Sequence, residues 1–222
     1  MTEVRAIDIA KWFIKNEFDT PRNTFDGNMK LQKLLFFSQL IHIAKYGKVL
    51  FLEEMKAYEN GTVINEVRLP YKTSLYYLID QSNQFDGFTD VEVNDTLRLT
   101  VELFGDMSAS ELSELNHELL CWKIPFNNSK TDKPKFYQLD KNTINITDPF
   151  FMEDIKRVKQ MVEEYDKSDD SMEFEIINGV TFYYDPNQLQ ITDEIAQMLE
   201  GYDYPEEAYF VTFDEEQGII IS

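Results

Sequence analysis

Residues 31–39 have the sequence LQKLLFFSQ and form the most apolar part of a longer stretch that predicts a helix over residues 29–46. The apolar side chains of this stretch point in nearly all directions around a helix, which is typical of a helix that is buried on every side. Asn28 can cap the start of this helix, and Gly47 suits its end because glycine adopts a positive φ without strain. We therefore expect this helix to be the centre of its domain.

Flanking segments predict further helices around this centre. A stripe of apolar residues predicts a helix over residues 4–18, and a shorter helix is expected from about residue 74 to residue 80. Asn94 or Asp95 is placed to cap another helix. The first 135 residues are therefore expected to be mainly helical.

Two local signals mark boundaries inside this helical part. An extended segment over residues 49–58 is followed by Asn60-Gly61, a pair that is typical of a tight turn. Ser108 and Glu111 are spaced as a capping box, in which the hydroxyl accepts from a backbone amide and the glutamate reaches back. The capping box predicts the start of one more helix.

The C-terminal third has a different pattern. Prolines and asparagines over residues 125–149 predict a connector, and Pro149 suits the first turn of a new helix. Alternating residues on either side of Asn178-Gly179 predict a β-hairpin from Phe174 to Tyr184. The remaining predicted elements are a helix over residues 193–200 and strands over residues 209–213 and 218–221.

The predicted fold class is therefore α+β. We expect a mainly helical N-terminal domain with a short extended turn region over residues 1–135, and a small acidic α+β module with β-hairpins over residues 136–222. The charge supports this division, because the chain has a net charge of −20 and residues 136–222 contain 5 Lys or Arg against 21 Asp or Glu. Such a surface repels phosphate and attracts basic partners. We expect no direct binding of nucleic acid, and a plain role in solubility is the simpler alternative.

Composition also bears on the compartment. No apolar stretch approaches the roughly 18 residues of a membrane span, and the N-terminus lacks the pattern of a secretory signal. The one cysteine, Cys121, cannot form an internal disulfide. We expect a cytoplasmic protein without membrane contact.

No catalytic or cofactor motif is evident. The sequence HELLC at residues 117–121 resembles a zinc-protease motif, but it lacks the second histidine, and the other histidine of the chain, His42, lies in a different predicted helix. A thiol-imidazole pair of Cys121 and His117 would lack an orienting group. No glycine-rich loop that would hold a phosphate is present. We expect no catalytic residues, no metal and no cofactor, and a protein that is not an enzyme.

Four segments of the N-terminal part together resemble one family. They are LQKLLFFSQ at 31–39, EMKAYENGTV at 54–63, Val67-Arg68, and MSASELSELNHE at 107–118 followed by Trp122. In this order and spacing they resemble the Panacea (SocA-like) antitoxin domain of bacteria and their viruses. The chain departs from the family pattern at five positions: Tyr58, Asn60, Thr62, Asn65 and Asn116.

The resemblance implies a function and a set of motif residues. Members of this family are antitoxins that neutralise a toxin, commonly encoded by the adjacent gene, by binding it directly. The candidate partner-binding or family-motif residues are Gln32, Lys33, Gln39, Gly61, Val63, Glu111, His117 and Trp122, together with Tyr58, which replaces the tryptophan of the family motif. These residues either bind the partner or maintain the fold, in which case Gln32, Lys33 and Glu59 tie the central helix to the turn.

The acidic module is our candidate for contact with a toxin that has a basic surface, and the hairpin from Phe174 to Tyr184 is a possible docking strand. Two alternatives stay open. One is a proteolytic adaptor that delivers the toxin to a host protease, which predicts loss of protection in cells without that protease. The other is an acidic mimic of nucleic acid that inhibits a nuclease or immune protein, as a phage or mobile element would encode.

Overall fold

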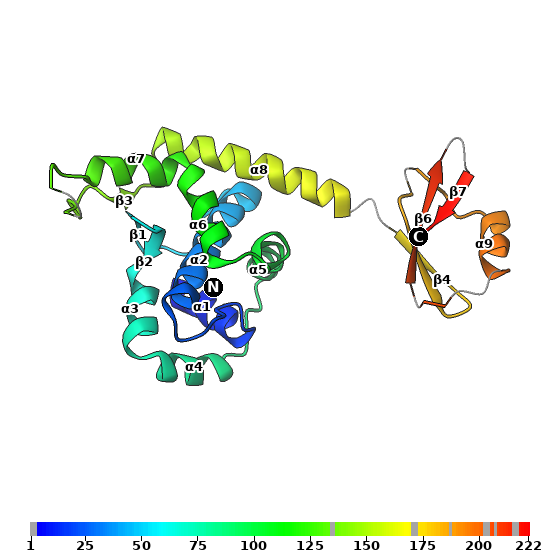
Figure 1. Ribbon diagram of the computed structural model, residues 1–222, viewed down its shortest axis with the longest axis horizontal. Coiled ribbons are helices and arrows are strands. Elements are labelled where there is room, and N and C mark those ends of the chain that lie inside the picture. Colours follow the sequence, from blue (N-terminus) through cyan, green and yellow to red (C-terminus); the bar gives the residue numbers. More distant parts are fainter. Residues whose placement is uncertain are drawn as a thin grey trace. The chain divides into compact units, whose positions relative to one another are not determined.

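The structure is a computed structural model that describes residues 4–133, 136–169, 173–186, 188–201, 205–206, 208–214 and 218–222. The chain forms two compact units, Met1–Gln160 and Met161–Ser222. The described helices lie mainly in the first unit, and each unit contains a small sheet (Figure 1). The predicted α+β class is confirmed.

Helix α2 (Phe25–Tyr46) is the centre of the first unit, as its all-round apolar pattern predicts (Figure 1). It contacts four other helices and one strand: α1 (Ala6–Lys15), α3 (Asn65–Thr73), α5 (Val91–Phe104), α6 (Ala109–Glu118) and β2 (Gly61–Ile64). Its end at Gly47, with φ of 69°, is confirmed. Its start is not at Asn28, because Thr24 caps the helix by accepting a hydrogen bond from the Gly27 amide at 3.0 Å.

Other helices of the first unit differ from the expected boundaries. Helix α5 is capped by Asp90 and not by Asn94 or Asp95, since the Asp90 carboxylate accepts from the first free amides of the helix. The capping box of Ser108 and Glu111 at the start of α6 is confirmed. The other helices here are α4 (Leu75–Asn83) and α7 (Leu120–Ser129).

Helices α3 and α7 each contain a proline, and neither helix was predicted from the sequence. Pro70 lies inside α3, and Pro125 lies inside α7. The connector that was predicted from residue 125 therefore starts later, after Ser129. Burial of Trp122 and Phe126 on α7 offsets the hydrogen bond that a proline removes from a helix.

The sheet of the first unit has the strand order β2-β1-β3. Strand β1 (Met55–Tyr58) pairs antiparallel with β2, and the predicted reversal at Asn60-Gly61 joins them. The third strand, β3 (Thr143–Ile144), pairs antiparallel with β1 and was not predicted.

The two compact units divide after Gln160, whereas the sequence placed the boundary after residue 135. Strand β3 and the first part of α8 (Pro149–Asp169) explain the difference. Asn142 and Ala57 exchange two hydrogen bonds, and the buried Asp154 carboxylate accepts from the Cys121 amide at 2.7 Å. The predicted start of a helix at Pro149 is confirmed.

The second unit contains a four-stranded sheet with the order β4-β5-β6-β7. Its hairpin is confirmed, with positive φ at both turn residues, Asn178 and Gly179. Strands β5 and β6 are parallel and the other neighbours are antiparallel. The elements of the unit are β4 (Glu173–Ile177), β5 (Val180–Tyr184), α9 (Asp193–Glu200), β6 (Ala208–Asp214) and β7 (Gly218–Ile221).

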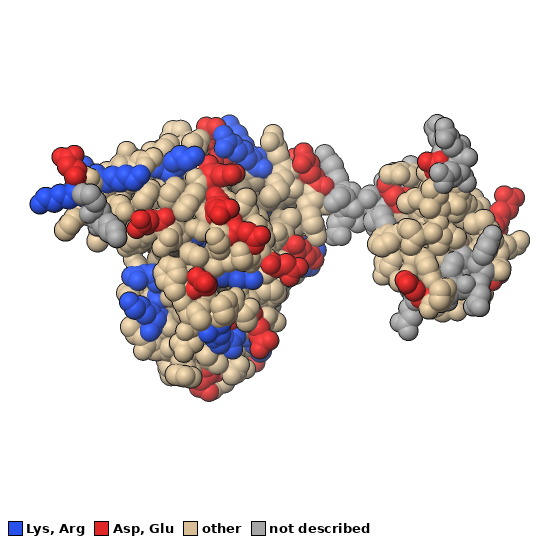
Figure 2. Space-filling view, viewed as in Figure 1, with Lys and Arg blue, Asp and Glu red and all other residues tan. Residues whose placement is uncertain are grey.

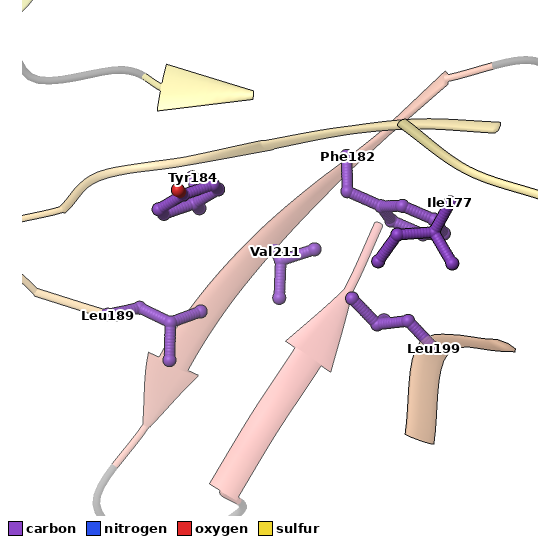
Figure 3. Packing of buried hydrophobic residues seen from close by; sticks show 6 residues of the cluster. All are labelled: Ile177, Phe182, Tyr184, Leu189, Leu199 and Val211. Atoms are coloured by element: carbon purple, nitrogen blue, oxygen red, sulfur yellow. The ribbon is translucent and has the colours of Figure 1, made fainter. Parts of the chain in front are cut away.

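One face of this sheet forms the core of the unit. Buried apolar side chains from three strands, from α9 and from the segment before it point toward one another (Figure 3): Ile177, Phe182, Tyr184, Leu189, Leu199 and Val211. The helix and that segment therefore cover one face of the sheet only.

Among the helices that the structure describes, none combines the length and the apolar composition that a bilayer crossing requires.

Candidate functional site

Two motif residues, Gln32 and Lys33, form a buried polar cluster with Thr62 and Asn116, two positions at which the chain departs from the family pattern, and we call these four residues the motif cluster. The Ile64 amide donates to Gln32 Oε1 at 2.7 Å, and Lys33 Nζ donates to the Thr62 carbonyl at 3.1 Å. The Thr62 amide donates to Asn116 Oδ1. Side chains from α2 and α6 thus satisfy the backbone of β2. Through Gln32 and Lys33, helix α2 is tied to the hairpin, which agrees with the fold-maintenance interpretation of these two residues.

Gly61 lies against this cluster with φ of 97°. A Cβ atom at this position would lie 2.4 Å from Asn116 Oδ1 and 2.5 Å from Lys33 Cε. Only glycine fits here, because both the backbone conformation and the space exclude a side chain.

We expect Gly61→Ala to lower the free energy of unfolding by about 2–3 kcal/mol, through strain at positive φ and displacement of the motif cluster. Gly87→Ala is the matched control, because Gly87 also has a positive φ of 91°, but a Cβ atom added there would meet no heavy atom within 4 Å beyond its chain neighbours. We expect a loss of about 1 kcal/mol there. Urea denaturation of both variants measures the difference, and equal losses would contradict the role of the cluster.

Lys33 is the least ordinary member of the cluster. Its side chain is 1% exposed, and it has no acidic partner among the residues that the structure describes. Burial lowers the pKa of Lys33 to about 7 because the charged form loses its hydration. The protein thus keeps a lysine where burial disfavours its charge.

His117 and Trp122 hold the corner between α6 and α7. Their rings lie 4.1 Å apart between centroids, and Trp122 Nε1 donates to the Tyr58 carbonyl at 2.9 Å. Burial lowers the pKa of His117, and the charge of Lys33 lowers it further. These two motif residues therefore position the junction of α6 and α7 against strand β1.

His117 and Cys121 lie on different helices, because α6 ends at Glu118 and α7 begins at Leu120. The Cys121 amide donates to Asp154, and burial raises the pKa of the Cys121 thiol above its ordinary value. The two side chains thus have separate surroundings, which gives no support to a thiol-imidazole pair. Among the described residues, no group of three or more His, Cys, Asp or Glu is arranged to hold a metal.

Two further motif residues bond backbone groups. Gln39 Oε1 accepts from the Leu50 amide at 2.8 Å and from the Phe51 amide at 3.2 Å, and its Nε2 donates to the Phe51 carbonyl. Glu111 accepts from the Ser108 amide at 2.8 Å in the capping box. These contacts position the loop after α2 and the start of α6.

A pocket of about 600 Å³ opens beside the motif cluster. Its walls come from the first part of α2, the β1–β2 hairpin, α3 and Tyr137. Four motif residues, Gln32, Lys33, Tyr58 and Val63, line it. Lys72 and Tyr137 also line the pocket and were not predicted from the sequence, because neither the helix α3 nor the segment after α7 showed a periodic pattern.

In the second unit, the sheet face opposite α9 carries exposed apolar side chains, and we call it the open face. Phe174, Ile176, Tyr183 and Phe210 are exposed by 59%, 65%, 37% and 53%. The ring centroids of Phe174 and Tyr183 lie 5.9 Å apart, and those of Tyr183 and Phe210 lie 5.6 Å apart. The three rings form a row across β4, β5 and β6.

The two hairpin residues singled out from the sequence lie on opposite faces. Phe174 belongs to the open face, whereas Tyr184 is 6% exposed in the core and donates through its hydroxyl to Glu173 at 3.1 Å. The register that pairs Phe174 with Tyr183 explains this separation. Strand β4 is also an edge strand of the sheet.

The second unit is strongly acidic. Residues 161–222 contain 17 Asp or Glu and a single basic residue, Lys167. Figure 2 shows red side chains but no blue ones on the visible, described part of this unit. The open face is thus an apolar surface on an acidic unit.

Comparison with models of protein families matches residues 31–123 to the family described as antitoxin SocA-like, Panacea domain. Comparisons with curated proteins and with solved structures give no match. The matched stretch contains the motif cluster, Gly61 and Trp122, and none of the second unit. The resemblance seen in the sequence is confirmed, and the match supports an antitoxin role in general.

Proposed function

We propose that this chain, in which residues 31–123 match the Panacea domain, is an antitoxin that neutralises a protein toxin by binding it directly and without catalytic turnover. The observation that carries this proposal is the open face, an exposed row of aromatic rings on a unit outside the matched stretch. Exposed aromatic residues that form a contiguous patch are typical anchors of protein interfaces.

The charge of the second unit indicates the kind of toxin surface. A unit with 17 acidic residues and one lysine attracts a basic surface and speeds the encounter with it. A toxin surface that normally faces RNA or nucleotides has this character. In the complex, the row of aromatic rings makes the apolar contact with the toxin. The surrounding carboxylates attract the basic surface of the toxin during the encounter.

The first unit has a supporting role in this proposal. The polar groups of Gln32, Gln39 and Asn116 bond backbone groups of the unit itself. Such contacts stabilise a scaffold and leave the choice of partner to other surfaces. The second unit is the appendage that provides this choice.

Co-expression with the product of the adjacent gene tests the proposal. We expect that product to arrest growth alone, to be harmless together with this chain, and to purify with it as a complex. Protection in cells that lack the main cytoplasmic proteases separates direct binding from delivery to a protease. A toxic neighbour that this chain neither binds nor neutralises would contradict the proposal.

Removal of the second unit is expected to abolish protection. The cut belongs after Asp169, the last residue of α8, because apolar side chains are buried along this helix as far as Val162. The shortened chain then lacks the four-stranded sheet and α9 of the second unit. Circular dichroism of the shortened chain checks that its helices remain. Full protection by a folded, shortened chain would refute the role of the second unit.

A further inference from the structure

We propose that the pocket beside the motif cluster binds a small organic anion, one that carries both a carboxylate or phosphate group and an aromatic ring. Its volume of about 600 Å³ lies within the range of ligand pockets in proteins. The proposal is independent of the antitoxin role and rests on charge, on buried donors and on aromatic walls.

The pocket wall carries more positive than negative charge. Three basic side chains line it, Lys33, Arg68 and Lys72, together with one carboxylate, Glu59. This excess of positive charge occurs in a chain with a net charge of −20, so composition does not explain it. Figure 2 shows blue Lys and Arg side chains over the position that α3 has in Figure 1.

Two buried donor groups beside the pocket have hydrogen-bonding capacity that a ligand can use. Gln32 is 2% exposed, and its Nε2 has no hydrogen-bond partner among the described residues. When protonated, Lys33 Nζ can donate three hydrogen bonds, and among the residues that the structure describes it donates one, to the Thr62 carbonyl. A buried donor without a partner costs about 1–3 kcal/mol, which an anionic oxygen would offset.

Two cationic side chains of α3 lie at the pocket wall. Arg68 Nε donates to Asn65 Oδ1 at 3.0 Å, which fixes the guanidinium group at the pocket wall. A guanidinium group held in this way is suited to the two oxygens of a carboxylate or phosphate. Lys72 follows one turn later on the same helix and lines the same pocket.

Part of the pocket wall is aromatic. Phe25, Tyr58 and Tyr137 line the pocket, and Phe25 is 67% exposed. Aromatic side chains beside a few fixed polar groups are typical of sites that hold a ring and orient its charged group. A ligand with a ring and an anionic group would use both parts of the wall.

The electrostatics of Lys33 support this class of ligand. Burial lowers the pKa of Lys33 to about 7, and a bound anion favours the protonated form. The other charged or titratable groups around it, among the described residues, are His117 on α6, Tyr58 and Glu59 on the hairpin, Arg68, Tyr71 and Lys72 on α3, and Tyr137. The affinity for an anion should therefore increase as the pH falls through about 7, the value at which Lys33 gains its proton.

Isothermal titration of the full chain tests the proposal with four probes: adenosine 5′-monophosphate, phenylpyruvate, adenosine and inorganic phosphate. We expect at least one of the two ring-bearing anions to bind with a Kd below about 1 mM. Adenosine, which has no charge, and phosphate, which has no ring, should bind at least about tenfold more weakly.

Variants place the binding in this pocket. Lys33→Met and Arg68→Gln should each weaken the binding of the best probe at least about tenfold. Lys45→Met is the matched control, because Lys45 lies on the same helix but pairs with Asp95 at 2.9 Å outside the pocket. Three results overturn the proposal: no probe binds at about 10 mM, phosphate binds as tightly as the ring-bearing anions, or both pocket variants keep the full affinity.

Discussion

Replacement of Phe174, Tyr183 and Phe210 by serine should weaken the complex with the toxin by at least about 100-fold, or about 3 kcal/mol. These rings form the row on the open face, and each is at least 37% exposed in the free protein. Aromatic anchors in the centre of an interface commonly contribute about 1–2 kcal/mol or more each. Calorimetry or surface plasmon resonance with the purified toxin measures the change.

The matched control is a second triple variant on exposed side chains of the first unit. Leu52, Tyr76 and Tyr77 are exposed by 70%, 82% and 66%, and their replacement by serine should leave the affinity unchanged. Thermal unfolding of both variants shows whether the fold survives, which we expect because none of the six side chains is buried. Equal affinities of the two variants would show that the open face is not the interface.

Lys33→Met is expected to raise the free energy of unfolding at pH 6 by about 4 kcal/mol. The pKa of Lys33 is lowered from 10.5 to about 7 in the folded state because burial disfavours its charge. Below pH 7 both folded and unfolded chains hold the proton, so the folded state bears the full cost of about 5 kcal/mol. Loss of the hydrogen bond to Thr62 reduces the gain by about 1 kcal/mol.

The gain should shrink as the pH rises. Between pH 7 and 10.5 the unfolded chain still binds the proton and the folded chain does not, so the cost of the buried charge decreases until both forms are neutral. Urea denaturation at pH 6, 8 and 10 measures this trend, and Lys45→Met should show none of it. A Lys33→Met protein that is less stable than the original at pH 6 would contradict the burial of this charge.

This expected gain has a functional meaning. A lysine that lowers stability by several kcal/mol is uncommon in a scaffold, and buried groups with displaced pKa values are typical of binding or catalytic sites. Lys33 also lines the pocket beside α3. The stability of Lys33→Met and its affinity for an anion should therefore change in opposite directions.

Elements with strong local signals were predictable from the sequence. The all-round apolar pattern of residues 29–46 predicted the central helix, the Ser108 capping box predicted α6, and Asn178-Gly179 predicted the hairpin. In each case neighbouring residues contain the whole signal, either as periodicity or as the chemistry of a cap or turn.

Elements that depend on distant residues were not predictable in this way. Strand β3 exists because Thr143 and Ile144 pair with β1, which lies far away in the sequence. Two interactions hold the residues after 135 against the first unit: the pairing of β3 with β1, and the hydrogen bond from the Cys121 amide to the buried Asp154 carboxylate. The prolines and asparagines from Pro125 onward predicted a connector. The structure instead has helix α7 through Pro125, because the buried side chains on either side of the proline stabilise the helix.

The candidate sites show the same limit. Family resemblance identified Gln32, Lys33 and Gly61, and the structure shows how they fit together around β2. Alternation along β4 was visible in the sequence, but the face on which Phe174 lies depends on its pairing with Tyr183. An exposed apolar face therefore became visible only once the register of the sheet was known.

We propose that this chain neutralises a toxin because its acidic second unit binds a basic surface of that protein. The most direct test is the Kd of the full chain for the product of the adjacent gene, measured from about 50 to about 500 mM NaCl. We expect a stable complex whose affinity falls at least about tenfold over this range, because salt screens the attraction between the two surfaces. No complex at any salt concentration, or an affinity that salt leaves unchanged, would contradict the claim.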